Sequence, residues 1–344
     1  MLLFPLLSTA LLFSTSITSA LALALPAPRG LSAENLNPHM AEVRATRLEK
    51  PIISPPFPDN RVQEKDLQKE LKPKRWVSMK WHSGYLPRMC LQHAEINHVD
   101  PSKFEVRYVY FEDCVAPWPV CRHVNAKESW RTILQTLGKV PVGMRQYASH
   151  IVILAEPHPE HWGAYVMGTV ITVFPGSFTL GVLMHEFSHI LDLVVLQPYV
   201  ADLKEYPPGT SFSATRQWAE AIGNDTAVPT DYARTNVVED FADVGRWAIS
   251  DLVHRGGVGK YTRGWVGFKH QMYVYERLLC NIIFPKKEVC TIRAYDTSDP
   301  VAIGELQDGD AKPNGTLHGT MLNTFVVPPE ANERIHMCYP GSGA

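Results

Sequence analysis

The residues of this chain best suited to chemistry are two histidines one helical turn apart. They are His185 and His189, and Glu186 directly follows the first of them. Apolar residues recur at helical spacing over 180–195, so both imidazoles are expected on one face of a helix. Imidazoles placed in this way can bind one Zn²⁺, with Glu186 beside the ion as a general base. The alternative is a buried helix with two incidental histidines.

A second predicted helix, over 237–252, offers a third metal ligand. Glu239 lies near its start, and a His₂Glu set leaves the fourth position of the metal to water, as hydrolysis requires. Asp243, one turn further on, is expected to accept a hydrogen bond from a ligand histidine and so fix its tautomer. Asp192 either plays a similar part or faces solvent. The alternative for Glu239 is a favourable charge at a helix N-terminus.

This pattern of HExxH, then a glutamate on a later helix and an aspartate four residues on, resembles the gluzincin metallopeptidases. Tyr232 lies seven residues before Glu239, which resembles the arrangement in the anthrax lethal factor-like subgroup. By that resemblance Tyr232 stabilises the oxyanion of the reaction. Ser188 departs from the subgroup, which often has glycine inside HExxH. The resemblance implies a zincin-like domain with a small sheet and an active-site helix.

The sequence also resembles the conidiation-specific secreted proteins of filamentous fungi. Three stretches carry this second resemblance and together span most of 90–252: residues 109–122, with Asp113-Cys114, Pro117-Trp118 and Cys121-Arg122; residues 141–145; and residues 218–243. Activity across those fungal proteins is not implied by the resemblance.

Outside the predicted site, the chain divides into three parts. Residues 1–22 form an uncharged, apolar leader that ends in small residues, as a secretory signal peptide does; the alternative is a membrane anchor. Residues 23–75 are rich in proline and end in the basic pair Lys74-Arg75, which indicates either a propeptide cleaved at Arg75 or a linker. Residues 76–344 are then the catalytic domain, with a C-terminal segment tied in by a disulfide.

An oxidising compartment is consistent with an even number of cysteines and with two glycosylation sequons, at Asn224 and Asn314. Three disulfides are expected, and although any of 15 pairings is open, proximity in sequence favours Cys114–Cys121 and Cys280–Cys290. We expect no free thiol among the six: Cys90, Cys114, Cys121, Cys280, Cys290 and Cys338.

Composition and periodicity indicate a globular α+β chain. It has 344 residues and a net charge of −2, which argues against a strongly basic nucleic-acid binder. Strands are predicted at 106–111, 151–154 and 166–174, and a further helix at 130–137. The strand at 166–174 is a candidate edge for an extended peptide.

The sequence therefore predicts a secreted zinc peptidase that acts on peptides or proteins, binds neither nucleic acid nor, once the leader is removed, a membrane, and is a monomer. The first alternative is an inactive spore or cell-wall protein that retains a zinc site. The second is a disulfide-stapled binding domain without metal.

Overall fold

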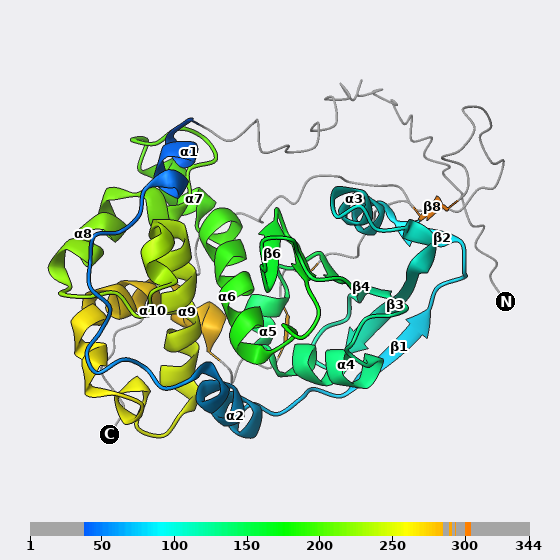
Figure 1. Ribbon diagram of the computed structural model, residues 1–344, viewed down its shortest axis with the longest axis horizontal. Helices are drawn as coiled ribbons and strands as arrows, with labels where there is room; N and C mark the ends of the chain where they lie inside the picture. The colour runs from blue at the N-terminus through cyan, green and yellow to red at the C-terminus, as the bar shows by residue number, and fades with distance from the viewer. Residues whose placement is uncertain (1–37, 285–288, 291–292, 294–299, 304–344) are drawn as a thin grey trace, which may run out of the picture.

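The computed structural model describes residues 38–284, 289–290, 293 and 300–303. The predicted signal peptide, the sequon at Asn314, Cys338 and most of the C-terminal segment lie outside these residues. Within them the chain is α+β, as predicted, with the sheet on one side and most helices on the other (Figure 1).

The main sheet is mixed and six-stranded, in the order β1-β3-β4-β5-β7-β6. Its central pairs β4–β5 and β5–β7 are parallel, and the outer pairs are antiparallel. The strands are β1 (Trp76–Lys80), β3 (Phe104–Phe111), β4 (Trp118–His123), β5 (His150–Ile153), β6 (Ala164–Met167) and β7 (Val170–Val173). A separate pair joins β2 (Tyr85–Pro87) to β8 (Pro300–Ala302).

The stretch 166–174, expected as one strand, is instead part of a hairpin. β6 and β7 pair antiparallel around Gly168, which has a φ of 61°. A glycine adopts this left-handed conformation without steric cost, so the chain reverses there. The result is that β6, rather than the whole stretch, forms the edge of the sheet.

The described part of the chain has ten α-helices: α1 (Pro38–Ala45), α2 (Asn60–Glu70), α3 (Arg88–Ile96), α4 (Trp130–Lys139), α5 (Val142–Arg145), α6 (Leu180–Ile190), α7 (Gln197–Asp202), α8 (Arg216–Asn224), α9 (Val237–Val253) and α10 (Lys269–Ile283). The helices predicted over 130–137, 180–195 and 237–252 are confirmed as α4, α6 and α9, with a π-helical turn continuing α6 over Leu191–Val195.

Alternation along the buried strands separates two apolar cores, one on each face of the sheet. Ile151 and Ile153 of β5 point into the larger core, which includes α6 and α9, whereas Val152 points into the smaller core under α3. Successive strand side chains face opposite sides, so one strand serves both cores. The apolar side of α6 is thereby buried between the sheet and α9.

The apolarity of α6 has a packing explanation. Among the described residues, the single helical stretch long and apolar enough to cross a membrane is Leu180–Asp202, and 72% of its apolar window is buried inside the protein. The core of the domain accounts for this burial.

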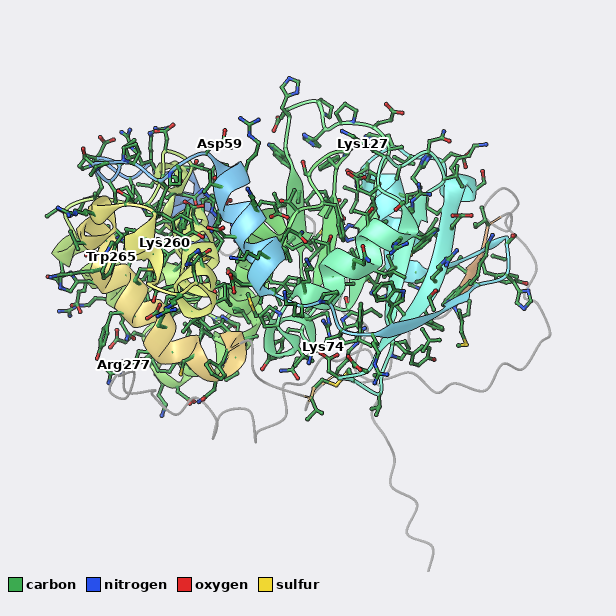
Figure 2. All side chains as sticks on the ribbon, turned by 90° about the horizontal axis from the view of Figure 1, so that it is seen from below. Asp59, Lys74, Lys127, Lys260, Trp265 and Arg277 are labelled. Carbon is green, nitrogen blue, oxygen red and sulfur yellow. A yellow bond between two sulfur atoms is a disulfide. The ribbon has the colours of Figure 1, made fainter. Side chains whose placement is uncertain are left out.

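Residues 38–75, expected as a propeptide or linker, pack against the domain. α2 lies across the join between the sheet half and the helical half, starting after the labelled Asp59 (Figure 2). Glu64 of α2 accepts hydrogen bonds from the first amides of α6, and Gln63 donates to Ser250 on α9. The packing shows no break at Arg75, and cleavage there stays a prediction.

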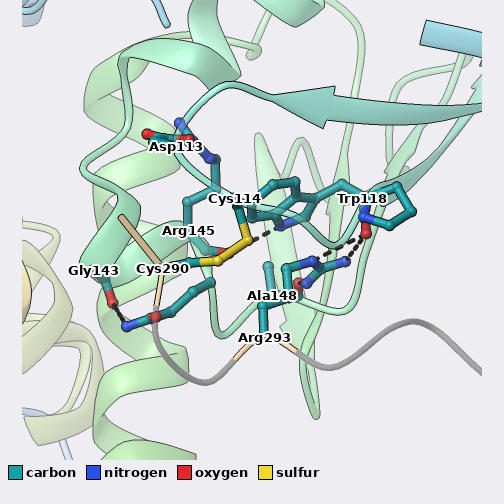
Figure 3. The surroundings of a disulfide bond; sticks show 10 residues. Asp113, Cys114, Trp118, Gly143, Arg145, Ala148, Cys290 and Arg293 are labelled. Carbon is teal, nitrogen blue, oxygen red and sulfur yellow. Dashed lines mark hydrogen bonds and ion pairs between the residues drawn. A yellow bond between two sulfur atoms is a disulfide. The ribbon is translucent and has the colours of Figure 1, made fainter. Parts of the chain in front are cut away.

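The disulfides differ from those that proximity favoured. Cys90 pairs with Cys121, and Cys114 pairs with Cys290 (Figure 3). Cys114 packs in the core on the α6 face of the sheet and Cys121 in the core under α3, so the two are separated although they are close in sequence. Cys280 is also disulfide-bonded, and no described cysteine is free.

Candidate metal centre

The site is built where α6 packs against α9. Thr179 caps α6 by accepting a hydrogen bond from the Val182 amide. The two helices approach closely at Gly245 of α9, where a Cβ atom would lie 2.1 Å from Ser188 Oγ. That hydroxyl donates to the Met184 carbonyl and also contacts the Tyr275 hydroxyl. Ser188, which departs from the lethal factor-like pattern, therefore points toward α9 and the Tyr275 hydroxyl and not toward the metal ligands.

Three ligand atoms meet at this contact between the helices. Glu239 Oε2 lies 3.1 Å from His185 Nε2 and 3.3 Å from His189 Nε2. The ligand atoms of all three residues lie within 4.8 Å of one another, and both histidines are buried. Asn236 caps α9 by accepting from the Glu239 amide, which fixes the turn that carries this carboxylate. The structure thus brings together the three residues predicted as ligands.

The charges of the cluster favour the ionised form of Glu239 beside the two imidazoles. Burial disfavours the charged form of Glu239, but the neighbouring His189 and His185 outweigh it and hold its pKa well below the ordinary value. Burial also disfavours the imidazolium of His189, yet the charge of Glu239 raises the pKa of that ring.

This donor set fits zinc. Two imidazole nitrogens and one carboxylate oxygen are ligands that Zn²⁺ takes, and three protein ligands leave one tetrahedral position open for chemistry. A buried oxygen, Glu186 Oε2, has no hydrogen-bond partner in the described structure. Glu186 is 5% exposed, and its burial, together with the charge of Glu239, raises its pKa against the opposing effect of the histidines.

Tyr232 lies at the rim of the cluster. Its ring centroid is 5.5 Å from that of His185, and the side chain is 57% exposed. Desolvation within the site and the charges of Glu239 and Glu186 raise the pKa of its hydroxyl, so it stays protonated and able to donate.

Asp243 does not have the partner that was expected. Its Oδ2 accepts a hydrogen bond from Thr230 at 2.5 Å, and its Oδ1 lies 2.7 Å from Arg246 Nε. These contacts satisfy the carboxylate within the helix and the preceding loop, so the prediction that it bonds a ligand histidine is wrong. It supports the turn before Tyr232 instead, because Thr230 in turn accepts from the Ala233 amide.

Asp192 is fully buried, so the alternative that it faces solvent is wrong. It accepts hydrogen bonds from the amide and the hydroxyl of Ser213, at 2.8 and 2.6 Å. Burial raises its pKa to about 6. Asp192 therefore anchors the loop after α7. It does not bond the ligand histidine, because His189 Nδ1 has no hydrogen-bond partner in the described structure.

Two supporting residues were missed in the sequence. Thr230 precedes Ala233 by three residues, a spacing typical of a side chain that bonds a following amide, so a local signal existed. Glu64, which holds the start of α6 from α2, has no such signal because 116 residues separate it from Leu180. Of the two sequons, Asn224 is exposed at the end of α8, where a glycan has room.

The fold and the site thus define an α+β protein with a His-His-Glu cluster on two neighbouring helices, in which both histidines are buried. Comparison with known families is more specific. The family model for conidiation-specific protein Con-13 matches residues 60–269, well over half of the chain, and the chain therefore belongs to this family.

A curated relative agrees with this membership. The Conidiation-specific protein 13 of Neurospora crassa is 27% identical over 186 residues, which cover 53% of this chain and 51% of that protein. The chain thus spans about half the length of the relative it matches. No solved structure matches the chain.

Part of the resemblance to the family has a structural explanation. Arg145 is fully buried and forms an ion pair with Asp113 (Figure 3). Its guanidinium carbon lies 4.3 Å from the ring centroid of Phe111 and 5.0 Å from that of Trp118. Trp118 in turn donates to the Arg145 carbonyl. These residues, beside the Cys114–Cys290 bond, build the core and not the metal centre.

Proposed function

We propose that this chain is a zinc-dependent peptidase with a zincin-like fold and gluzincin-type ligands. The observation that carries the proposal is the meeting of His185, His189 and Glu239 beside a buried oxygen of Glu186 that has no partner in the described structure. A purely structural zinc site has no use for a fourth, partnerless carboxylate at this place.

His185 and His189 would hold the ion through Nε2, and Glu239 through Oε2. Bound zinc would polarise a peptide carbonyl and lower the pKa of a water molecule toward about 7. Because Asn236 caps α9 and Glu64 holds the start of α6, the two helices that carry the ligands are fixed before the ion binds.

Glu186 is the general base of the proposed reaction. Its free oxygen accepts a proton from the attacking water, and the resulting carboxylic acid passes the proton to the leaving amine. The raised pKa of Glu186 makes its carboxylate a stronger base, which favours the first of these transfers. Tyr232, which stays protonated, donates to the oxyanion.

The free edge of β6 suggests how a peptide is held. β6 ends the sheet, packs against α6 and is partly exposed along its whole length. An extended peptide that pairs with this edge forms main-chain hydrogen bonds without regard to its sequence. We therefore propose peptides or proteins as substrates, with no nucleic acid and no membrane as partners and a monomer as the working unit. Together with the disulfides, the predicted leader makes secretion the proposed localisation.

The proposal is tested by metal removal and return. The purified chain is treated with a chelator, reloaded with Zn²⁺, and assayed at each stage on a mixed peptide library with mass-spectrometric detection of products. We expect cleavage that disappears with the metal and returns with one equivalent of zinc. Cleavage that survives complete metal removal, or none at any stage in a folded, zinc-loaded chain, would contradict the proposal; the second result would favour an inactive wall protein.

A further inference from the structure

Tyr232 is 57% exposed and its ring meets His185 on one side, so its position depends strongly on the backbone that carries it. Tyr232 lies in a tight turn in which Arg234 N donates to the Asp231 carbonyl and Thr235 N to the Tyr232 carbonyl. A hydrogen-bond donor in a reaction must be held within about 0.5 Å of its productive position. Something outside this short turn must therefore fix it.

From the inner side, the turn is held by Asp243. The carboxylate accepts from Thr230 Oγ1, and the same oxygen of Thr230 accepts from the Ala233 amide at 3.2 Å. Asp243 is 1% exposed, and Arg246, one turn further along α9, also contacts its carboxylate. This fixes the start of the turn, but not its far side.

From the outer side, the turn is held by the segment between α1 and α2, residues 47–53, which we call the strap. It runs along the helical half of the molecule (Figure 1). Its backbone forms two hydrogen bonds with Val228, which lies before the turn: Ile53 N donates to the Val228 carbonyl, and Val228 N donates to the Pro51 carbonyl. On the other side of Tyr232, Leu48 N donates to the Arg234 carbonyl at 2.9 Å.

Side chains of the strap add to these bonds. Arg47 forms an ion pair with Asp231, the neighbour of Tyr232, at 3.2 Å. Lys50 Nζ donates to the Asp225 carbonyl at 2.5 Å. The strap is itself anchored in the core by Ile53, which is 1% exposed. Backbone bonds on both sides of Tyr232 thus connect it to a part of the sequence that precedes the domain boundary expected at Trp76.

We propose that the strap is a positioning element of the active site, which holds Tyr232 over the metal centre through the bond from Leu48 to Arg234. The effect on catalysis rests on the proposed function. That the strap holds the turn at Tyr232 rests on the geometry alone. It makes residues 47–53 part of the working enzyme, whether or not the chain is cut at Arg75.

The test uses Leu48→Pro, which removes the N–H donor, and Glu49→Pro as its matched control. Glu49 is exposed, and its amide donates no hydrogen bond within the described residues. Hydrogen exchange over 229–237 is measured by mass spectrometry in both variants and the wild type. We expect exchange about tenfold faster in Leu48→Pro and unchanged in Glu49→Pro. Equal exchange in the two proline variants overturns the proposal.

A double-mutant cycle tests the catalytic consequence. Leu48→Pro is expected to lower kcat by about 10²-fold with KM and zinc content unchanged, because it misplaces one donor. In a Tyr232→Phe background the same change should lower kcat no further, since the donor is already lost. A loss of equal size in both backgrounds means general destabilisation and overturns the proposal.

Two further arms keep the outcomes separate. If Leu48→Pro fails to fold, Arg47→Glu takes its place, with Arg47→Lys as control; faster exchange over 229–237 in the first alone supports the strap, and equal exchange overturns it. If the wild type cleaves no peptide, the proposed function fails, while hydrogen exchange still decides whether the strap holds the turn.

Discussion

Three side chains from two helices meet at the metal centre although His185 and Glu239 are 54 residues apart. The i, i+4 histidine spacing is local and could be predicted, because the helix alone places both rings on one face. The partners of Asp243 could not be predicted, because Thr230 reaches one carboxylate oxygen only once the loop before α9 has folded, while Arg246 contacts the other. Local geometry is thus readable in the sequence, and tertiary hydrogen-bond partners are not.

At the residue scale, Glu239 and Tyr232 should separate metal binding from turnover. Glu239→Gln replaces a charged ligand with a neutral amide and should lower zinc affinity by more than the roughly 10–100-fold typical of changes behind the ligands. Tyr232→Phe should keep zinc and lose about 10²–10³-fold in kcat, as expected for one oxyanion donor. Zinc titration with a competing chelator and steady-state kinetics measure the two. Normal affinity in Glu239→Gln would remove it from the ligand set.

Among the elements, the helices were predicted well and the sheet less well. The 3.6-residue period of α6 and α9 is long enough to be unambiguous, whereas β6 and β7 are short, and their apolar run reads as one strand until the turn at Gly168 is known. The disulfides were missed for a related reason. Pairing depends on which core each cysteine enters: Cys121 of β4 lies with Cys90 of α3 in the core under α3, whereas Cys114 lies in the core on the α6 face.

The packing of α3 makes the stability of the domain depend on pH. His93 of α3 is fully buried and bonds Thr172 of β7 at 2.7 Å. Burial, and secondarily the proximity of His150, lowers the pKa of His93 to about 4 from its ordinary 6.5. Between these values only the unfolded chain binds the proton, so the free energy of unfolding falls as the pH drops from about 6.5 to about 4.

The size of this effect is about 3 kcal/mol for a shift of this extent. Urea unfolding at pH 7 and pH 4 measures it in the wild type and in His93→Gln, which keeps a polar group but does not titrate. The loss of stability on acidification should be smaller in His93→Gln by this amount. His82→Gln, at an exposed site, is the control and should behave as the wild type does. An equal loss in wild type and His93→Gln would contradict the assignment.

For the whole molecule, the structure adds most to the description of residues 38–75, which were expected to be a propeptide or a linker. Proline content and the lack of periodicity over 26–60 favoured a linker or propeptide, but three apolar side chains of 38–75 are deeply buried: Met40, Ile53 and Leu67 are each 1% exposed. Composition averages over a segment, and it cannot show that a few widely spaced side chains enter a core formed by distant residues.

This packing predicts the fate of a cut chain. A specific protease site inserted between Lys72 and Arg75 is cleaved in the folded protein, and the fragments are separated by size under native and denaturing conditions. Each buried apolar side chain contributes about 1.5–3 kcal/mol, so the N-terminal fragment should stay bound in the native state and separate only on denaturation. Its release under native conditions would show that it behaves as a removable propeptide.

The central claim of the account is that Glu186 acts on water beside a metal held by three other residues. Zinc content, thermal unfolding and peptide hydrolysis are measured side by side for the wild type and Glu186→Gln. The account predicts one zinc and an unchanged melting temperature in both, with hydrolysis lower in Glu186→Gln by about 10²–10⁴-fold, the usual contribution of a general base. Equal hydrolysis by the two zinc-loaded proteins, or zinc binding lost with Glu186, would contradict it.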